Sequence, residues 1–110
     1  MEFLEHPLFA RQREGILDDP GMNSLMVLLT NRPESGVVIP KGGGLRKVRV
    51  AANGKGKRGG ARVIYYWQRE NSLITFLSIY AKNRQEKLTG KELKFLRNLV
   101  ENEDHEKGQE

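Results

Sequence analysis

The sequence predicts an α+β fold: a small, mostly antiparallel sheet with two N-terminal helices packed on one face and a further helix at the C-terminal end. Two observations predict this class. Three segments in the second half of the chain alternate in polarity or are rich in β-branched and aromatic residues, as strands are. The segments on either side carry leucines at helical spacing. Because 110 residues is a usual size for one domain, we expect residues 1–110 to form a single domain.

The N-terminal part is expected to contain a short strand and two helices. Residues 3–7 are typical of an extended opening, and a short helix should follow and reach Leu17. In Asp19-Pro20 a capping acid precedes a proline, which suits the first turn of a second helix. This helix should end before Pro33, because proline disfavours helical backbone in the residue before it. Residues 36–40 are expected to be a connection.

Three strands and a helix are expected to follow. Residues 45–51 alternate in polarity, and residues 61–68 and 73–81, separated by a hairpin-sized turn, should pair antiparallel. Of the three consecutive aromatic residues 65–67, at least one must point into the core. Thr89-Gly90-Lys91-Glu92 is a capping box that predicts the start of the last helix, and the tail from about residue 102 is expected to fray.

Composition excludes several classes of protein. No cysteine is present, which excludes disulfide scaffolds, thiolate metal sites and cysteine nucleophiles. The apolar runs are far shorter than the roughly 20 residues of a membrane span, so no membrane association is expected. The first residues lack the pattern of a secretory signal. These features predict a soluble protein that stays in the cytoplasm.

The basic residues are concentrated in one part of the chain. Residues 41–69 hold nine Lys and Arg residues and no Asp or Glu, whereas the net charge of the whole chain is +5. Such an unrelieved basic stretch indicates a polyanionic partner such as a nucleic acid. A solubilising surface, or a surface for an acidic protein partner, is the alternative. The candidate contacts for such a partner include Arg46, Lys55, Lys57 and Arg58.

The glycine-rich segment 54–59, Gly-Lys-Gly-Lys-Arg-Gly, matches the dinucleotide fingerprint only in its letters. That fingerprint needs a helix directly after it, and here a strand is expected instead. We therefore expect no nucleotide cofactor. The segment is interpreted as a cationic loop whose glycines let backbone amides approach a phosphate, with an ordinary hairpin loop as the alternative.

The residues available for catalysis are few. His6 and His105 are far apart in the sequence, and no acidic or histidine cluster has the spacing of metal ligands, so no metal site is expected. Catalysis would have to use Lys, Arg, Tyr and isolated carboxylates. Lys47 and Arg49 share one side of their strand, and Arg62 and Lys82 could meet them at one end of the sheet. The alternative is that these cations simply face solvent.

Three blocks of the sequence carry a resemblance to a known family. They are Gly43-Gly44-Leu45-Arg46-Lys47-Val48-Arg49-Val50, the segment from Gly54 to Tyr66, and Ile79-Tyr80-Ala81-Lys82-Asn83. In this order and spacing they resemble the RelE/ParE superfamily, and specifically the HigB-like toxins of type II toxin-antitoxin systems. The similarity covers most of the chain, and the family's order of elements is the one predicted above.

The resemblance implies a ribosome-dependent endoribonuclease that cuts mRNA without a metal, inhibits translation and is silenced by a HigA-like antitoxin. Lys47, Arg49 and Arg62 match basic strand positions of RelE, and Lys82 falls near a further arginine of that family. Arginine stays protonated, so Arg49 and Arg62 would stabilise the phosphate, whereas Lys47 could accept a proton; the identity of the base stays open. The tyrosine that RelE uses would fall near Leu88, and Tyr80 is a possible substitute or else a packed ring.

Two other functions compete with this one. ParE-like members of the same superfamily inhibit DNA gyrase and lack the catalytic basic set, so the four cations argue against that function. A plain RNA-binding module that does not cleave is the second alternative, and the sequence does not distinguish it from the nuclease.

Overall fold

The computed structural model describes residues 1–52, 60–81 and 88–108, with side chains up to residue 101. None of the helices in these ranges is long and apolar enough to cross a membrane. The elements in chain order are β1 (Glu2–Glu5), α1 (Pro7–Arg13), α2 (Asp19–Asn31), the 3-10 helix η1 (Pro33–Ser35), β2 (Val37–Val38), β3 (Leu45–Val50), β4 (Ala61–Gln68), β5 (Leu73–Ala81) and α3 (Gly90–Gly108).

The strands form one sheet in the order β1-β5-β4-β3-β2. β1 pairs parallel with β5, and every other neighbouring pair is antiparallel. The predicted α+β class, with its mostly antiparallel sheet and C-terminal helix, is confirmed. The prediction of a plain connection over residues 36–40 is wrong, because Val37 and Val38 pair with β3. A two-residue strand is too short for its alternation to be visible in a sequence.

The two N-terminal helices begin and end at identifiable residues. His6 caps α1, with its Nδ1 accepting the amide of Leu8 at 3.1 Å. α1 ends at Arg13, earlier than predicted, and Gly15 follows in the left-handed conformation with φ 77°. The cap of α2 is Asp18, one residue before the predicted Asp19, and its carboxylate accepts the amide of Gly21 at 2.8 Å.

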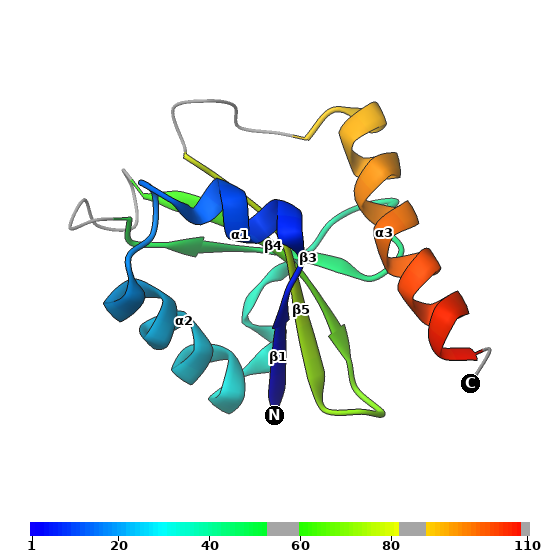
Figure 1. Ribbon diagram of the computed structural model, residues 1–110, viewed down its shortest axis with the longest axis horizontal. Helices are drawn as coiled ribbons and strands as arrows, with labels where there is room; N and C mark the ends of the chain where they lie inside the picture. Colours follow the sequence, from blue (N-terminus) through cyan, green and yellow to red (C-terminus); the bar gives the residue numbers. More distant parts are fainter. Residues whose placement is uncertain (53–59, 82–87, 109–110) are drawn as a thin grey trace.

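The two faces of the sheet are covered by different helices, and Figure 1 shows α2 and α3 on opposite sides of it. On the α2 face, a buried cluster joins the N-terminal helices to the strands through residues that include Phe9, Leu25, Leu29, Val63 and Phe76. On the α3 face, Leu96 and Val100 pack on Leu45, Ile64, Leu77 and Tyr80.

The first turn of α3 has the predicted capping box. The amide of Glu92 donates to Thr89 Oγ1 at 3.1 Å, and the amide of Thr89 donates to Glu92 Oε1 at 3.0 Å. The helix continues to Gly108. Residues 102–108 are thus helical in backbone, and fraying of this tail stays a prediction.

α1 lies along β5 beyond the end of β1. β1 pairs only with residues 73–76 of β5. Further along, Gln12 of α1 takes the place of a strand: its Oε1 accepts the amide of Ile79 at 3.1 Å and the hydroxyl of Ser78 at 3.0 Å. A side chain therefore satisfies a backbone donor that would otherwise be open.

Candidate functional site

A row of polar side chains crosses the three central strands on the α3 face. Arg49 of β3 lies directly opposite Arg62 of β4, and Arg62 lies directly opposite Tyr80 of β5. Side chains at directly opposite positions share a face and have Cβ atoms about 5 Å apart. The sheet register therefore brings together three residues that are 13 and 18 positions apart in the sequence.

Lys47 belongs to the same face, two residues from Arg49. It lies opposite Ile64 in β4 and is partly buried. It lines a cleft of about 280 Å³ together with Ile39, Pro40, Leu88 and Leu93. Three of the four cations that the sequence placed together, Lys47, Arg49 and Arg62, thus lie on one face of the sheet, and the fourth, Lys82, lies outside the described residues.

Arg62 is the most buried cation of this group, with 7% of its surface exposed. Its Nη1 donates to the carbonyl oxygen of Ala61 at 3.4 Å. Within residues 1–52, 60–81 and 88–101, neither Arg62 nor Lys47 nor Arg49 forms an ion pair with a carboxylate. A buried charge is costly unless it is paired, so this arrangement favours an anionic ligand.

Tyr80 is a packed residue. It is 3% exposed, and its hydroxyl is buried without a hydrogen-bond partner among the described residues. Burial raises the pKa of Tyr80 above its ordinary value; the charge of Arg62 lowers it and that of Glu92 raises it. The hydroxyl therefore stays protonated at neutral pH but does not reach solvent in this conformation.

Glu92 is a part of this environment that the sequence did not reveal. Its position in the capping box predicted only its role at the start of α3. Its charge also acts on Tyr80, because α3 packs on the sheet beside β5. The residues next to Glu92 in the sequence do not show that it lies near Tyr80.

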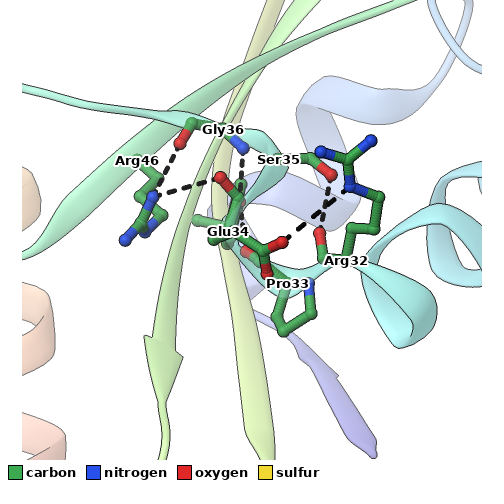
Figure 2. Close-up of polar contacts among 7 residues, drawn as sticks. Arg32, Pro33, Glu34, Ser35, Gly36 and Arg46 are labelled. Atoms are coloured by element: carbon green, nitrogen blue, oxygen red, sulfur yellow. Dashed lines mark hydrogen bonds and ion pairs between the residues drawn. The ribbon is translucent and has the colours of Figure 1, made fainter.

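Arg46 lies on the opposite face from Lys47 and Arg49. Its Nη1 donates to the carbonyl oxygen of Gly36 at 2.8 Å and to that of Glu34 at 3.3 Å, as Figure 2 shows. Tyr65, directly opposite Arg46 in β4, donates its hydroxyl to Pro33 O at 2.6 Å and accepts the amide of Gly36 at 2.8 Å. The structure thus uses Arg46 to hold residues 33–36 and separates it from the row on the α3 face.

Glycine at position 36 makes this contact possible. A Cβ atom there would lie 2.7 Å from Cε1 of Tyr65, which is closer than real atoms approach. Tyr65 is fully buried, so its ring has no space in which to retreat. At least one of the aromatic residues 65–67 was expected in the core; Tyr65 is fully buried there, and Gly36 packs against its ring.

The remaining predicted site residues are placed as follows. Lys55, Lys57, Arg58 and Lys82 lie outside the described residues. His6 caps α1 and is thus used in the fold. Among the side chains that the structure describes, no three His, Cys, Asp or Glu residues form a group that could hold a metal ion.

Comparison with protein families assigns the chain. Residues 23–109 match the family described as the RelE toxin of the RelE/RelB toxin-antitoxin system. The match begins within α2 and includes every strand from β2 to β5 together with α3, and hence all members of the row on the α3 face. The chain therefore belongs to the RelE toxin family: it is the toxin of a toxin-antitoxin system and has a cognate antitoxin as its partner.

Proposed function

We propose that this toxin is a HigB-like, ribosome-dependent endoribonuclease that inhibits translation by cutting mRNA. In the proposed reaction an RNA 2′-hydroxyl attacks the adjacent phosphorus and the bond to the 5′-oxygen breaks. The products are a 2′,3′-cyclic phosphate and a 5′-hydroxyl. The observation that carries the proposal is the set of Lys47, Arg49 and Arg62 on one sheet face, with no carboxylate partner among the described residues.

The two arginines are assigned to charge stabilisation. Negative charge builds up on the phosphoryl oxygens as the 2′-oxygen attacks, and fixed cations aimed at those oxygens lower the barrier. Arg62 is held by burial and Arg49 lies beside it at the surface. Burial strengthens the field of Arg62, because less water screens it.

Two proton transfers complete the reaction, and we assign them to lysines. Arginine does not give up its proton in proteins, so we assign the acceptor role to Lys47, which would take the 2′-hydroxyl proton as a neutral amine and become an ammonium group. The leaving 5′-oxygen takes up a proton, and we assign this donation to the ammonium group of Lys82, which lies two residues beyond Tyr80 in the sequence. We give Tyr80 a positioning role beside Arg62, since its buried hydroxyl does not reach a substrate.

The ribosome is proposed to supply the remaining part of catalysis. In-line attack requires the 2′-oxygen, the phosphorus and the 5′-oxygen to be aligned, and alignment contributes much of the rate in such reactions. A face with a few cations offers charge but little to bend a flexible RNA. Binding at the ribosome also places the toxin in the cytoplasm, and a HigA-like antitoxin would be the partner that silences it.

The test compares one mRNA in two states, naked and bound to programmed ribosomes. We expect cleavage only on ribosomes, with new ends that carry a 5′-hydroxyl and therefore need phosphorylation before ligation. Ribosomes need magnesium, so the role of a metal in the chemical step is tested by replacing magnesium with other ions that keep ribosomes assembled. The single-turnover rate of cleavage should not follow the Lewis acidity of the ion. Efficient cutting of naked RNA, or 5′-phosphate ends, would contradict the proposal. Tight RNA binding without new ends would favour the non-cleaving alternative.

A further inference from the structure

The two edges of the sheet differ in character. At one edge, β1 has the sequence Glu-Phe-Leu-Glu, and its acidic residues are exposed. At the other edge, β2 consists of Val37 and Val38, which are 72% and 51% exposed. Charged residues at an edge strand discourage pairing with another chain, whereas exposed valines favour it. The β2 edge therefore has the features of an interaction surface.

One residue of β2 directs its backbone away from the sheet. Val37 pairs with Lys47, and the amide of Ile39 donates to Leu45 O at 2.9 Å. Backbone groups alternate in direction along a strand, so those of Val38, between these two residues, point outward. The neighbouring groups cannot be used by a partner, because Gly36 binds Tyr65 and Arg46, and Pro40 has no amide hydrogen.

The surroundings of this edge are cationic. Between residues 32 and 52 the sequence has one acidic residue, Glu34, which pairs with Arg32 at 3.9 Å. Val37 lies directly opposite Lys47, which has no ion pair among the described residues. Lys41, at the end of the same connection, is exposed. A partner that covers the valines would therefore meet unpaired positive charge beside them.

We propose that the β2 edge is a docking surface for the cognate antitoxin, which adds an extended, apolar and acidic segment beside Val37 and Val38. The two valines supply apolar contact, the backbone of Val38 fixes the position of the segment, and its carboxylates meet Lys41 and Lys47. Because Lys47 lies opposite Val37, a carboxylate bound there also neutralises a cation of the catalytic row. The proposal rests on membership of the toxin family and is independent of the RNA chemistry.

The experiment measures the affinity of purified toxin for its cognate antitoxin by titration calorimetry. Val38→Pro removes the outward amide and leaves the bonds of Val37 and Ile39 to β3 unchanged. Val37→Thr combined with Val38→Thr keeps the shape and strand preference of valine but removes apolar contact. We expect each variant to weaken binding by about tenfold or more. The matched control is Leu4→Thr at the β1 edge, where the leucine is 47% exposed, and its affinity should stay at the wild-type value.

Two further measurements make the result decisive. The Val38 amide of the wild-type toxin should exchange hydrogen more slowly in the complex, and this test requires no variant to fold. Expressed without antitoxin, the valine variants should remain toxic, whereas the antitoxin should rescue growth less well than it does against the wild type.

Wild-type affinity in folded variants, or an unprotected Val38 amide, would overturn the proposal. So would variants that change only self-association of the toxin, which would indicate a second copy as the occupant. Failure of the nuclease proposal would leave these binding results unchanged.

Discussion

The two faces of the sheet each carry an arginine directly opposite a tyrosine, and the two pairs differ in their partners. On the α2 face, Arg46 and Tyr65 bind the backbone of residues 33–36 through four hydrogen bonds. On the α3 face, Arg62 has one long bond to Ala61, and the Tyr80 hydroxyl has no partner among the described residues. The same two residue types thus hold the fold through hydrogen bonds on one face, and on the other face they leave Arg62 without a carboxylate partner among the described residues.

This difference indicates how the two pairs are used. A buried polar group that is satisfied by the fold contributes to stability, and its loss leaves its partners unpaired. A buried cation without a carboxylate partner costs stability and retains its full capacity for an anion. Changes in the first pair should therefore alter the free energy of unfolding, and loss of Arg62 from the second pair should alter activity.

The largest expected effect is on the α3 face. Arg62→Ala should lower the single-turnover rate of mRNA cleavage on programmed ribosomes by about 100-fold or more, because it removes a fixed stabiliser of the transition-state charge. Circular dichroism should show that the variant is folded. Arg69→Ala is the matched control, since Arg69 lies in the turn between β4 and β5 and stacks over Trp67 at 4.9 Å, and it should cleave at the wild-type rate. A folded Arg62→Ala protein with wild-type cleavage would remove Arg62 from the mechanism.

The next effect is on the α2 face. Tyr65→Phe should lower the free energy of unfolding by about 1–3 kcal/mol, because the Gly36 amide and the Pro33 carbonyl lose their partner. Urea unfolding should show a lower midpoint at an unchanged slope. Cleavage by the folded variant should persist. An unchanged midpoint would mean that these hydrogen bonds contribute nothing to stability.

The smallest effect is expected for Tyr80→Phe, which removes a hydroxyl without a partner. At pH 7 the free energy of unfolding should change by less than about 0.5 kcal/mol. At alkaline pH the two proteins should diverge. Burial raises the pKa of Tyr80 above its ordinary 10.0, so above that pH the unfolded chain releases the proton first and the folded state binds more protons. Stability then falls as pH rises.

Phenylalanine has no such proton, so Tyr80→Phe should lose less stability than the wild type when urea unfolding is repeated at about pH 11. The pKa of Tyr65 is also raised by burial, but Tyr65 is present in both proteins and its effect cancels in the difference. A loss at pH 7 as large as that of Tyr65→Phe would show that the Tyr80 hydroxyl has a hydrogen-bond partner after all.

The sequence predicted the fold where local pattern decides it and was less informative where distant segments meet. Alternation in residues 45–51 correctly placed Lys47 and Arg49 on one side, and the capping box located the start of α3. The same alternation put Arg46 on the other side, yet its role depends on carbonyl groups 10 and 12 residues earlier. Those contacts follow from how η1 and β2 fold back on β3, which no short pattern records.

The site was predictable in its residue types and less so in its geometry. The basic stretch identified the cations, and the strand register determined which of them share a face. The burial of Tyr80 depends on α3, whose residues Leu96 and Val100 pack in the same cluster. A sequence shows that α3 is amphipathic, but it does not show over which strands the helix lies.

The contact of Gln12 with β5 has a consequence for self-association. Open strand edges are where identical chains join into aggregates, and native proteins protect them. Along Ser78 and Ile79 that protection is one amide side chain, because Gln12 occupies the backbone donor that an incoming strand would need. An intruding chain would have to displace α1 before it could pair there. Loss of the Gln12 amide would leave the Ile79 amide without its acceptor, so that displacement of α1 alone would open this edge to another strand.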